Sequence, residues 1–444
     1  MNFVPITERD QQAMLAAAGV DAFERLLSIP PGIPRAKWNL PKGLSEPELT
    51  GLLTGQAARN RTVRTEVSFL GAGATEHWIP SVVRYLFSRG EFLTAYTPYQ
   101  PEASQGTLQA MYEFQSMICD LTGMAVANAS LYEGASALAE AVVLALRATG
   151  RNRVAISRTV HPEYRQTLKT YLAGSEAALD LLPHRDGAVD PAAESKITDQ
   201  TACLVLQLPN AFGCIEEWAA LIRKAKAQGA LVIVSADPIA LSVVRPPAEI
   251  GADIVVGEGQ ALGTPLLYGG PYLGLFACRE ELLRRLPGRI VGRTRDANGR
   301  RGFVLTIQTR EQHIRRSRAT SNICTNEAMM ALNAAVYLAA LGKSGFRELG
   351  VQNLSKARYA HQTLTALPGV EPLFDRPFFN EFALSLPKDP EQVNAELLKR
   401  GFLGGLALKR WDPKLANGWL VCVTEARSKE QIDRFAEALR EILR

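Results

Sequence analysis

Residues 253–276, "DIVVGEGQALGTPLLYGGPYLGLF", contain a strand-like apolar run, a polar cluster, a glycine-rich loop and a second strand-like run. Short apolar runs bounded by glycine and proline are typical of strands buried inside a sheet. The loop has the small residues of a phosphate or cofactor site, but it has no lysine. The gap is much wider than the loop, because the next lysine after Lys226 is Lys343. Any function of this segment must therefore operate without an amine of its own.

The pattern around this stretch alternates strand and helix signals from about residue 65 to residue 290. Strand-like runs such as "ACLVLQLP" and "ALVIVSAD" are separated by helix-like ones such as "GASALAEAVVLALRATG" and "HPEYRQTLKTYLAG". This alternation predicts an α/β fold with a mostly parallel sheet covered by helices on both faces. Two long helical patterns follow over 326–368.

The order of these patterns predicts three parts. We expect a helical N-terminal extension over 1–64, a large α/β domain over 65–345 and a small α+β domain over 346–444. A chain of 444 residues is long enough for this division.

Composition favours a soluble globular protein. Hydrophobic residues make up 47% and charged residues 21% of the chain, and the net charge is only +5. This balance gives no reason to expect nucleic acid as a partner. The N-terminus lacks a secretory signal and no apolar run is long enough to span a membrane, so we expect a cytoplasmic protein. Six cysteines and five histidines are scattered without metal-binding spacing, which predicts reduced thiols and no metal site.

Residues that follow the strands are the first candidates for a site, because ligands of open parallel sheets bind beyond the carboxyl ends of the strands. Asp237 ends "ALVIVSAD", where it could pair with a ligand or cap the next turn. Gln260 follows the next strand. In large pyridoxal-phosphate enzymes of this architecture, these two positions hold the aspartate that pairs with the ring nitrogen and the Schiff-base lysine. Glutamine cannot replace that amine.

Two further segments could line a site. Tyr96, Tyr99 and Gln100 lie in a proline-bounded loop, where they could either reach a ligand or simply pack. Glu133 and Ser136 lie at a helix start, a place where free N–H groups favour an anion. A glutamate there would repel a phosphate, so capping is the better interpretation of this start.

A fourth segment, "TREQHIRRSRATSNICTN" over 309–326, is expected to be helical and to carry exposed arginines. They form either a solvated face or a docking patch for an acidic partner. The arginines are Arg310, Arg315, Arg316 and Arg318.

Three long segments resemble one family. They are "SFLGAGATEHWIPSVV" over 68–83, "EFLTAYTPYQPEASQGTLQAMYEFQSMICDLTGM" over 91–124 and "RRGFVLTIQTREQHIRRSRATSNICTNEA" over 300–328. The family is the N-terminal subunit of the two-subunit bacterial glycine decarboxylase, the P-protein of the glycine cleavage system. The resemblance covers nearly the whole chain and is weakest in the helical lead and the last hundred residues.

The resemblance implies a fold type I pyridoxal-phosphate architecture and a partner subunit that carries the cofactor and its lysine. "QALGTPLLYGGP" is similar to the lysine segment of that partner, with Gln260 at the lysine position. The expected activity is decarboxylation of glycine, with the aminomethyl group passing to the lipoyl arm of the H-protein. The expected assembly is a heterodimer, or a dimer of such heterodimers.

The same resemblance assigns expected roles to the candidate residues. This chain holds no catalytic lysine, and Glu133, Ser136, Asp237 and Gln260 would form a vestigial cofactor pocket. Tyr96, Tyr99 and Gln100 would reach a site shared with the partner, and the four arginines would dock the H-protein. The alternative is a structural or regulatory pseudoenzyme partner. An independent pyridoxal-phosphate lyase is a third possibility, and the lysine gap argues against it.

Overall fold

We analysed a computed structural model of the chain, which describes residues 5–27, 39–93, 96–324 and 326–444. The chain divides into two compact units, Met1–Arg61 and Thr62–Arg444. The first contains helices α1 (Glu8–Ala17) and α2 (Glu46–Ala57), each opened by a capping box. None of the described side chains in this unit is buried.

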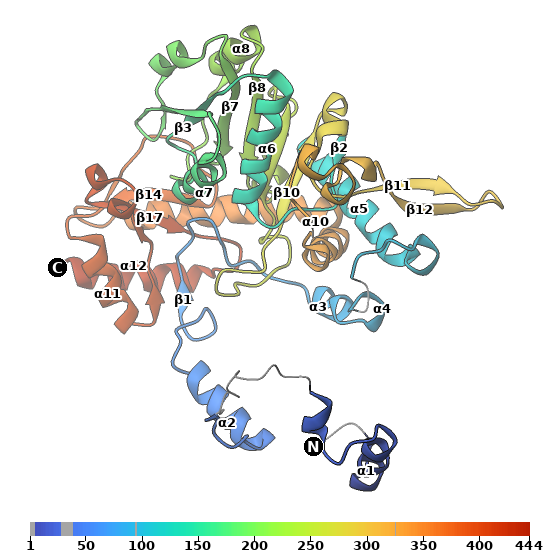
Figure 1. The fold of residues 1–444 in the computed structure, drawn as a ribbon. Coiled ribbons are helices and arrows are strands. Elements are labelled where there is room, and N and C mark those ends of the chain that lie inside the picture. The colour runs from blue at the N-terminus through green and yellow to red at the C-terminus, as the bar shows by residue number, and fades with distance from the viewer. Residues whose placement is uncertain (1–4, 28–38, 94–95, 325) are drawn as a thin grey trace. The chain divides into compact units, whose positions relative to one another are not determined.

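The second unit is built around a seven-stranded sheet with the order β2-β10-β9-β8-β7-β3-β4 (Figure 1). Strands β4, β3, β7, β8 and β9 run parallel, and β10 and β2 close one edge in antiparallel pairing. The strands are β2 (Val126–Ala127), β3 (Arg153–Ser157), β4 (Ala178–Leu182), β7 (Thr201–Leu208), β8 (Leu231–Ala236), β9 (Ile254–Glu258) and β10 (Gly274–Cys278). The predicted α/β fold with a mostly parallel sheet is confirmed.

Both faces of this sheet are covered, because successive residues of each strand point to opposite sides. In β7, Cys203 and Val205 pack with helices α6 (Gly134–Thr149) and α7 (Pro162–Leu172). Leu204 and Leu206 pack on the other face, with α5 (Gln105–Thr122), α8 (Ala219–Ala227) and α10 (Ala328–Thr365). Strands buried on both faces explain the continuous apolar runs of the sequence.

Helix α10 leads from the large sheet to a small one. It is interrupted at Gly342, which has a φ of 60° and separates the two helical patterns expected over 326–368. The small antiparallel sheet has the order β13-β14-β17-β16 and packs with helices α11 (Pro390–Lys399) and α12 (Lys429–Leu443). Its strands are β13 (Glu371–Pro372), β14 (Glu381–Ser385), β16 (Leu406–Ala407) and β17 (Gly418–Cys422).

The first residues of the second unit pack in the core of the small sheet, and the strands of the large sheet follow later in the sequence. Strand β1 (Val67–Ser68) pairs in parallel with β15 (Phe402–Leu403), and Phe69 stacks on Phe435 with ring centroids 3.8 Å apart. Helices α3 (Ser81–Phe87) and α4 (Gly90–Leu93) follow. This path brings the loop over residues 70–75 to the junction of the two sheets.

Two β-hairpins lie outside the large and small sheets. Strands β5 (His184–Arg185) and β6 (Ala188–Val189) form a short one. Strands β11 (Ile290–Arg295) and β12 (Arg301–Thr306) form a longer one that projects from the body of the unit (Figure 1). This second hairpin is not among the elements predicted from the sequence.

The prediction of a single helix within 309–326 is wrong. The described residues of this segment form short single-turn helices, among them the four-residue helix α9 (Gln312–Arg315), and Arg316 has a φ of 53°. Ile314 of α9 is exposed, and the buried apolar residues Ala319 and Ile323 lie beyond that helix, so they give it no apolar face. A helix without an apolar face gains little from tertiary packing.

Candidate functional site

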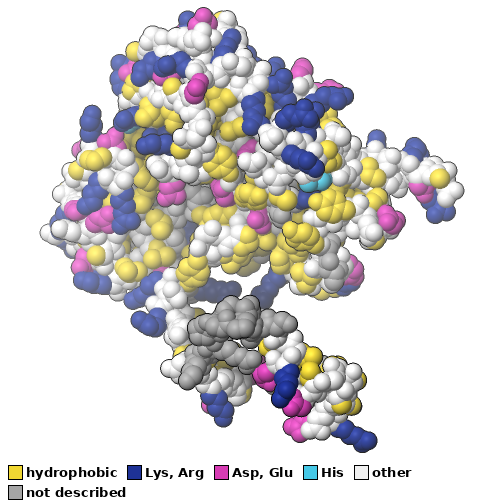
Figure 2. Space-filling model, viewed as in Figure 1, with side chains coloured by type: hydrophobic (Ala, Val, Ile, Leu, Met, Phe, Trp, Pro, Cys, Tyr) yellow, Lys and Arg dark blue, Asp and Glu magenta, His cyan; other side chains and the backbone are white. Residues whose placement is uncertain are grey.

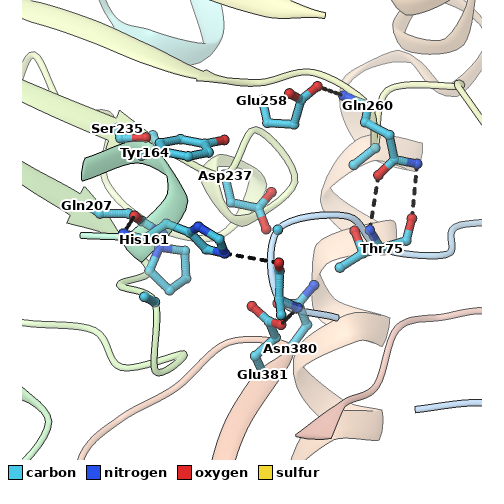
Figure 3. A pocket seen from close by; sticks show the side chains of 16 residues that line it. Thr75, His161, Tyr164, Gln207, Ser235, Asp237, Glu258, Gln260, Asn380 and Glu381 are labelled. Atoms are coloured by element: carbon cyan, nitrogen blue, oxygen red, sulfur yellow. Dashed lines mark hydrogen bonds between the residues drawn. The ribbon is translucent and has the colours of Figure 1, made fainter. Parts of the chain in front are cut away.

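A cavity of about 80 Å³ lies beyond the carboxyl ends of the parallel strands, where the large sheet meets the small one (Figure 3). Three segments far apart in the sequence complete it: the loop around Ala72, the start of α7 and the start of β14. The polar residues that line it are Thr75, His161, Tyr164, Gln207, Ser235, Asp237, Glu258, Gln260, Asn380 and Glu381. Asp237 and Gln260, which the sequence indicated as candidates at the ends of successive strands, therefore line the same cavity.

Gln260 is held by the backbone on both sides of its amide. Its Oε1 accepts the N–H of Thr75 at 3.0 Å, and its Nε2 donates to the carbonyl oxygens of Thr75 at 3.1 Å and Thr264 at 2.7 Å (Figure 3). The side chain is 2% exposed. The amide thus uses its hydrogen-bonding capacity within the fold. It lies at the position where the resemblance implies a lysine in the partner subunit.

Three carboxyl groups face the cavity. Asp237 caps the turn after β8, with Oδ1 accepting the N–H of Ile239 at 2.8 Å. Glu258 accepts the N–H groups of Gln260 at 2.8 Å and Leu273 at 3.0 Å. Burial raises the pKa of Glu258 and of Glu381 to about 7 each and also raises the pKa of Asp237.

The N-terminus of α6 is occupied by carboxylates. Glu133 is the N-cap residue, and its Oε2 accepts the N–H groups of Ala135 at 2.6 Å and Ser136 at 3.0 Å. The Ser136 hydroxyl also donates to Glu133. The N–H of Gly134 donates to Glu258 at 3.0 Å. The capping interpretation of this helix start is confirmed, and neither Glu133 nor Ser136 lines the cavity.

His161 and Tyr164 were not singled out as site residues from the sequence. His161 Nδ1 accepts the N–H of Glu163 at 3.3 Å, so its Nε2 carries the proton and donates to the carbonyl of Ala72 at 3.0 Å. Burial lowers the pKa of His161 and raises that of Tyr164 well above 10. Both groups are therefore neutral at physiological pH.

The loop tyrosines lie away from this cavity. Tyr96 is 80% exposed and Tyr99 is 51% exposed, and neither they nor Gln100 line the cavity. The hydroxyl of Tyr99 accepts a hydrogen bond from Arg289 Nη2 at 3.0 Å, and the Arg289 guanidinium lies 5.5 Å from the ring centroid. Tyr99 is thus oriented by a buried arginine while its ring remains accessible.

The four arginines do not share one environment. Arg315, Arg316 and Arg318 are exposed, but Arg310 is 8% exposed. The guanidinium of Arg310 donates to the backbone carbonyls of Ile307 at 3.1 Å, Gly288 at 3.0 Å and Leu286. The expectation that Arg310 belongs to an exposed docking patch is therefore wrong, because its charge is used to bind carbonyl oxygens inside the fold.

Comparison with known proteins identifies the family. The family model for the glycine cleavage system P-protein matches residues 1–439. The chain belongs to the P-protein family. It is 51% identical to the probable glycine dehydrogenase (decarboxylating) subunit 1 of Moorella thermoacetica, over 449 residues and all of both chains. It is 49% identical to the same subunit of Desulfitobacterium hafniense, again over all of both chains.

Solved structures show the same relationship. A crystal structure of a glycine decarboxylase P-protein in inhibitor-bound form is 45% identical, covers all of both chains and has a TM-score of 0.93. A Burkholderia pseudomallei sphingosine-1-phosphate lyase covers 91% of this chain and 92% of its own, at a TM-score of 0.67 and 17% identity. P-protein and these neighbours share the fold type I architecture of pyridoxal-phosphate enzymes.

The residues of this P-protein chain do not fit pyridoxal phosphate, the cofactor that the fold implies. No lysine or arginine lines the cavity among the described residues. The N–H groups of α6 that would attract a phosphate are already bound to Glu133 and Glu258. A volume of about 80 Å³ is also smaller than the roughly 150 Å³ cavity that admits benzene.

Proposed function

We propose that this chain is the subunit of a glycine decarboxylase that lacks the cofactor lysine. It pairs with a second subunit that carries pyridoxal phosphate, and together they decarboxylate glycine and pass the aminomethyl group to the lipoyl arm of an H-protein. The observation that carries this proposal is the Gln260 amide, bound to the backbone where an amine would be needed. The full-length similarity to proteins named subunit 1 supports it.

Exposed aromatic side chains support the pairing. Trp78, Tyr85 and Tyr268 are 74%, 61% and 82% exposed. Figure 2 shows hydrophobic side chains across the lower part of the second unit, where α3 and the loop after β9 lie. Exposed aromatic residues are enriched at protein interfaces, because they bury much apolar area and keep a polar group at the rim.

The first unit gives independent support. Helix α2 exposes Leu49, Leu52 and Leu53 at 44%, 49% and 53%, and the described residues around it form no buried core. Short helices gain most of their stability from packing an apolar face. We propose that these leucines pack in the assembled complex.

Reconstitution tests the proposal. The purified chain, the candidate cofactor-bearing subunit and their mixture are each assayed for absorbance of bound pyridoxal phosphate and for release of CO2 from glycine with H-protein. We expect bound cofactor in the partner and the mixture, and CO2 release in the mixture only. Activity of this chain alone would show that it has its own active site.

Tyr96, Tyr99 and Gln100 are proposed to reach the partner's site. Tyr96→Phe and Tyr99→Phe should each lower glycine–bicarbonate exchange of the complex, with Tyr112→Phe as the matched control on α5. Tyr112 is partly buried against Phe303, with ring centroids 5.3 Å apart. Unchanged exchange in both loop variants would favour the alternative, a structural or regulatory partner.

The exposed arginines Arg315, Arg316 and Arg318 are proposed to dock the H-protein. Replacing each with glutamine should weaken the apparent affinity of the complex for H-protein, and the loss should shrink as salt is added, because salt screens exposed charges. A salt-independent affinity would contradict this.

We further propose a cytoplasmic location, which cell fractionation checks. In the described residues, no helix is both long and apolar enough for a membrane span.

A further inference from the structure

A second cavity, of about 130 Å³, lies near the C-terminal end of α6. We call it the arginine cavity, and its lining residues are Arg284, Ile307, Thr309, Arg310, Arg315 and Thr320. Two neighbours of these residues contact Arg147 in the last turn of α6. Arg285 donates to the Arg147 carbonyl at 2.9 Å, and the Ala319 carbonyl accepts from the Arg147 guanidinium at 2.6 Å. The cavity described above lies at the other end of α6, where Glu258 binds the Gly134 N–H. A helix of 16 residues is about 24 Å long, so the two cavities are separate.

The lining of the arginine cavity is basic. Three of its six residues are arginines and two are threonines, and among the described residues no Asp or Glu lines it. Glu311, the carboxyl group next to Arg310 in the sequence, forms an ion pair with Arg289 at 3.7 Å instead. Figure 2 shows Lys and Arg side chains gathered on the surface beside α6, whose place is given in Figure 1. The cavity therefore combines positive charge with hydrogen-bond donors.

Arg310 is the buried arginine of this cavity, and it has donors to spare. It is 8% exposed. A guanidinium group has one N–H on Nε and two on each Nη atom. The carbonyls of Ile307, Leu286 and Gly288 accept one N–H from each of the three nitrogens. The second N–H of Nη1 and of Nη2 has no partner among the described residues. The backbone thus fixes the plane of a charged group that lines the cavity and leaves two of its donors unused.

The backbone beside this arginine is strained. Ile307, which also lines the cavity, has a φ of 53°. This conformation is rare for a β-branched residue, and it costs of order 1–3 kcal/mol. The Ile307 carbonyl accepts the hydrogen bond from Arg310 Nε at 3.1 Å, so the strained residue takes part in orienting the guanidinium. Strain of this kind is concentrated at ligand-binding positions in proteins.

We propose that the arginine cavity binds a phosphate group, as inorganic phosphate or as a phosphate monoester. Arg284, Arg310 and Arg315 donate to its oxygens, and the hydroxyls of Thr309 and Thr320 complete the donor set. Guanidinium forks bind phosphate oxygens in pairs, and charge-assisted hydrogen bonds of this kind are about twice as strong as neutral ones. A planar carboxylate has too few oxygens for three forks, and chloride cannot use a fork at all. The volume of about 130 Å³ restricts the ligand to a small one.

This inference does not rest on the proposed function, because it concerns binding by this chain alone. Arg315 is also one of the arginines proposed to dock the H-protein, so phosphate binding is measured without H-protein or a partner subunit. Failure of the reconstituted complex to decarboxylate glycine would leave the phosphate proposal intact, and absence of phosphate binding would leave the subunit proposal intact.

The test measures binding of inorganic phosphate and of glycerol 3-phosphate to the full chain by calorimetry and by the shift in thermal midpoint, at about pH 7.5, where arginines are charged. Acetate and chloride are the controls at equal ionic strength. We expect saturable binding of at least one phosphate compound, at least tenfold tighter than that of either control. Tighter binding of inorganic phosphate identifies the free ion as the ligand, and tighter binding of glycerol 3-phosphate identifies a monoester. Equal responses to all four, or no response to any, would overturn the proposal.

Matched variants locate the phosphate. Arg284 and Arg315 are exposed, so Arg284→Gln and Arg315→Gln should fold normally. Each should weaken phosphate binding roughly tenfold or more, as loss of a charge-assisted hydrogen bond predicts. Arg293→Gln is the control, because it makes the same change in net charge at an exposed arginine of β11 that does not line the cavity. Full phosphate binding by the Arg284→Gln, Arg315→Gln double variant would refute the site, and so would an equal loss in the control.

Discussion

Glu381→Gln should stabilise the protein at alkaline pH and have little effect in acid. Burial raises the pKa of Glu381 from its ordinary value of 4.5 to about 7, a difference of about 2.5, which at 1.36 kcal/mol for each pH unit corresponds to about 3 kcal/mol. Between pH 4.5 and about 7 the folded state binds more protons than the unfolded state, so stability falls as the pH rises through this window. Above it, the full penalty is present, and glutamine removes it.

The substitution is conservative where the fold uses this side chain. The amide oxygen of glutamine can still accept the N–H of Ala72, which Glu381 Oε1 accepts at 2.6 Å. The new NH2 group faces the cavity, where Asp237 can accept from it. The predicted gain is therefore electrostatic and does not depend on new packing.

Urea unfolding of the wild type, Glu381→Gln and the exposed control Glu371→Gln measures this effect at about pH 5 and pH 8.5. We expect Glu381→Gln to gain up to about 3 kcal/mol at the higher pH, a near-equal stability at the lower pH, and no pH-dependent gain in the control. An equal gain at both pH values would mean that the effect is packing and would refute the charge argument.

Three further predictions test the neighbouring structure. Gln260→Lys should give no reducible adduct with pyridoxal phosphate, because the α6 N–H groups that would bind its phosphate remain occupied. Mass spectrometry after borohydride treatment would detect an adduct, and the cofactor-bearing subunit is the positive control. Arg310→Ala should cost at least about 2 kcal/mol of unfolding free energy, because it leaves buried carbonyls unpaired, whereas Arg315→Ala should cost below about 0.5; equal costs would contradict this. Gly274→Ala should destabilise, because its Cβ would lie 2.8 Å from the Glu133 carbonyl oxygen, whereas Gly106→Ala on α5, with nothing within 4 Å, should stabilise by about 0.5–1 kcal/mol; thermal unfolding gives both signs.

The sequence predicts the large sheet well because its strands are covered on both faces. Such strands are continuous apolar runs, and the helices between them have clear caps and apolar faces. The prediction of a helix within 309–326 is wrong, because the local sequence does not determine the conformation of this segment. Its conformation is fixed by Arg310 binding the carbonyls of residues 286 and 288, and a long-range side-chain contact leaves no local pattern.

The candidate site is only partly visible in the sequence. Asp237 and Gln260 follow adjacent parallel strands, so their proximity could be predicted from topology alone. His161, Asn380 and Glu381 come from segments that reach the cavity only through tertiary packing. The one signal that could have indicated Glu381 is its place at the start of "EFALS", a glutamate preceding a buried strand, and such a residue more often faces solvent.

Two glycines on either side of the glycine-rich loop have a physical explanation that does not require a cofactor. A Cβ at Gly257 would collide with the carbonyl oxygen of Ala236 in the neighbouring strand, and one at Gly274 would collide with Glu133. These two glycines let β9 and β10 lie directly against β8 and the start of α6. That close approach places Glu258 where it can bind the N–H groups of Gly134 and Leu273. The two flanking glycines therefore let a carboxylate lie at the N-terminus of α6, and Glu258 accepts the Gly134 N–H that a phosphate would otherwise bind.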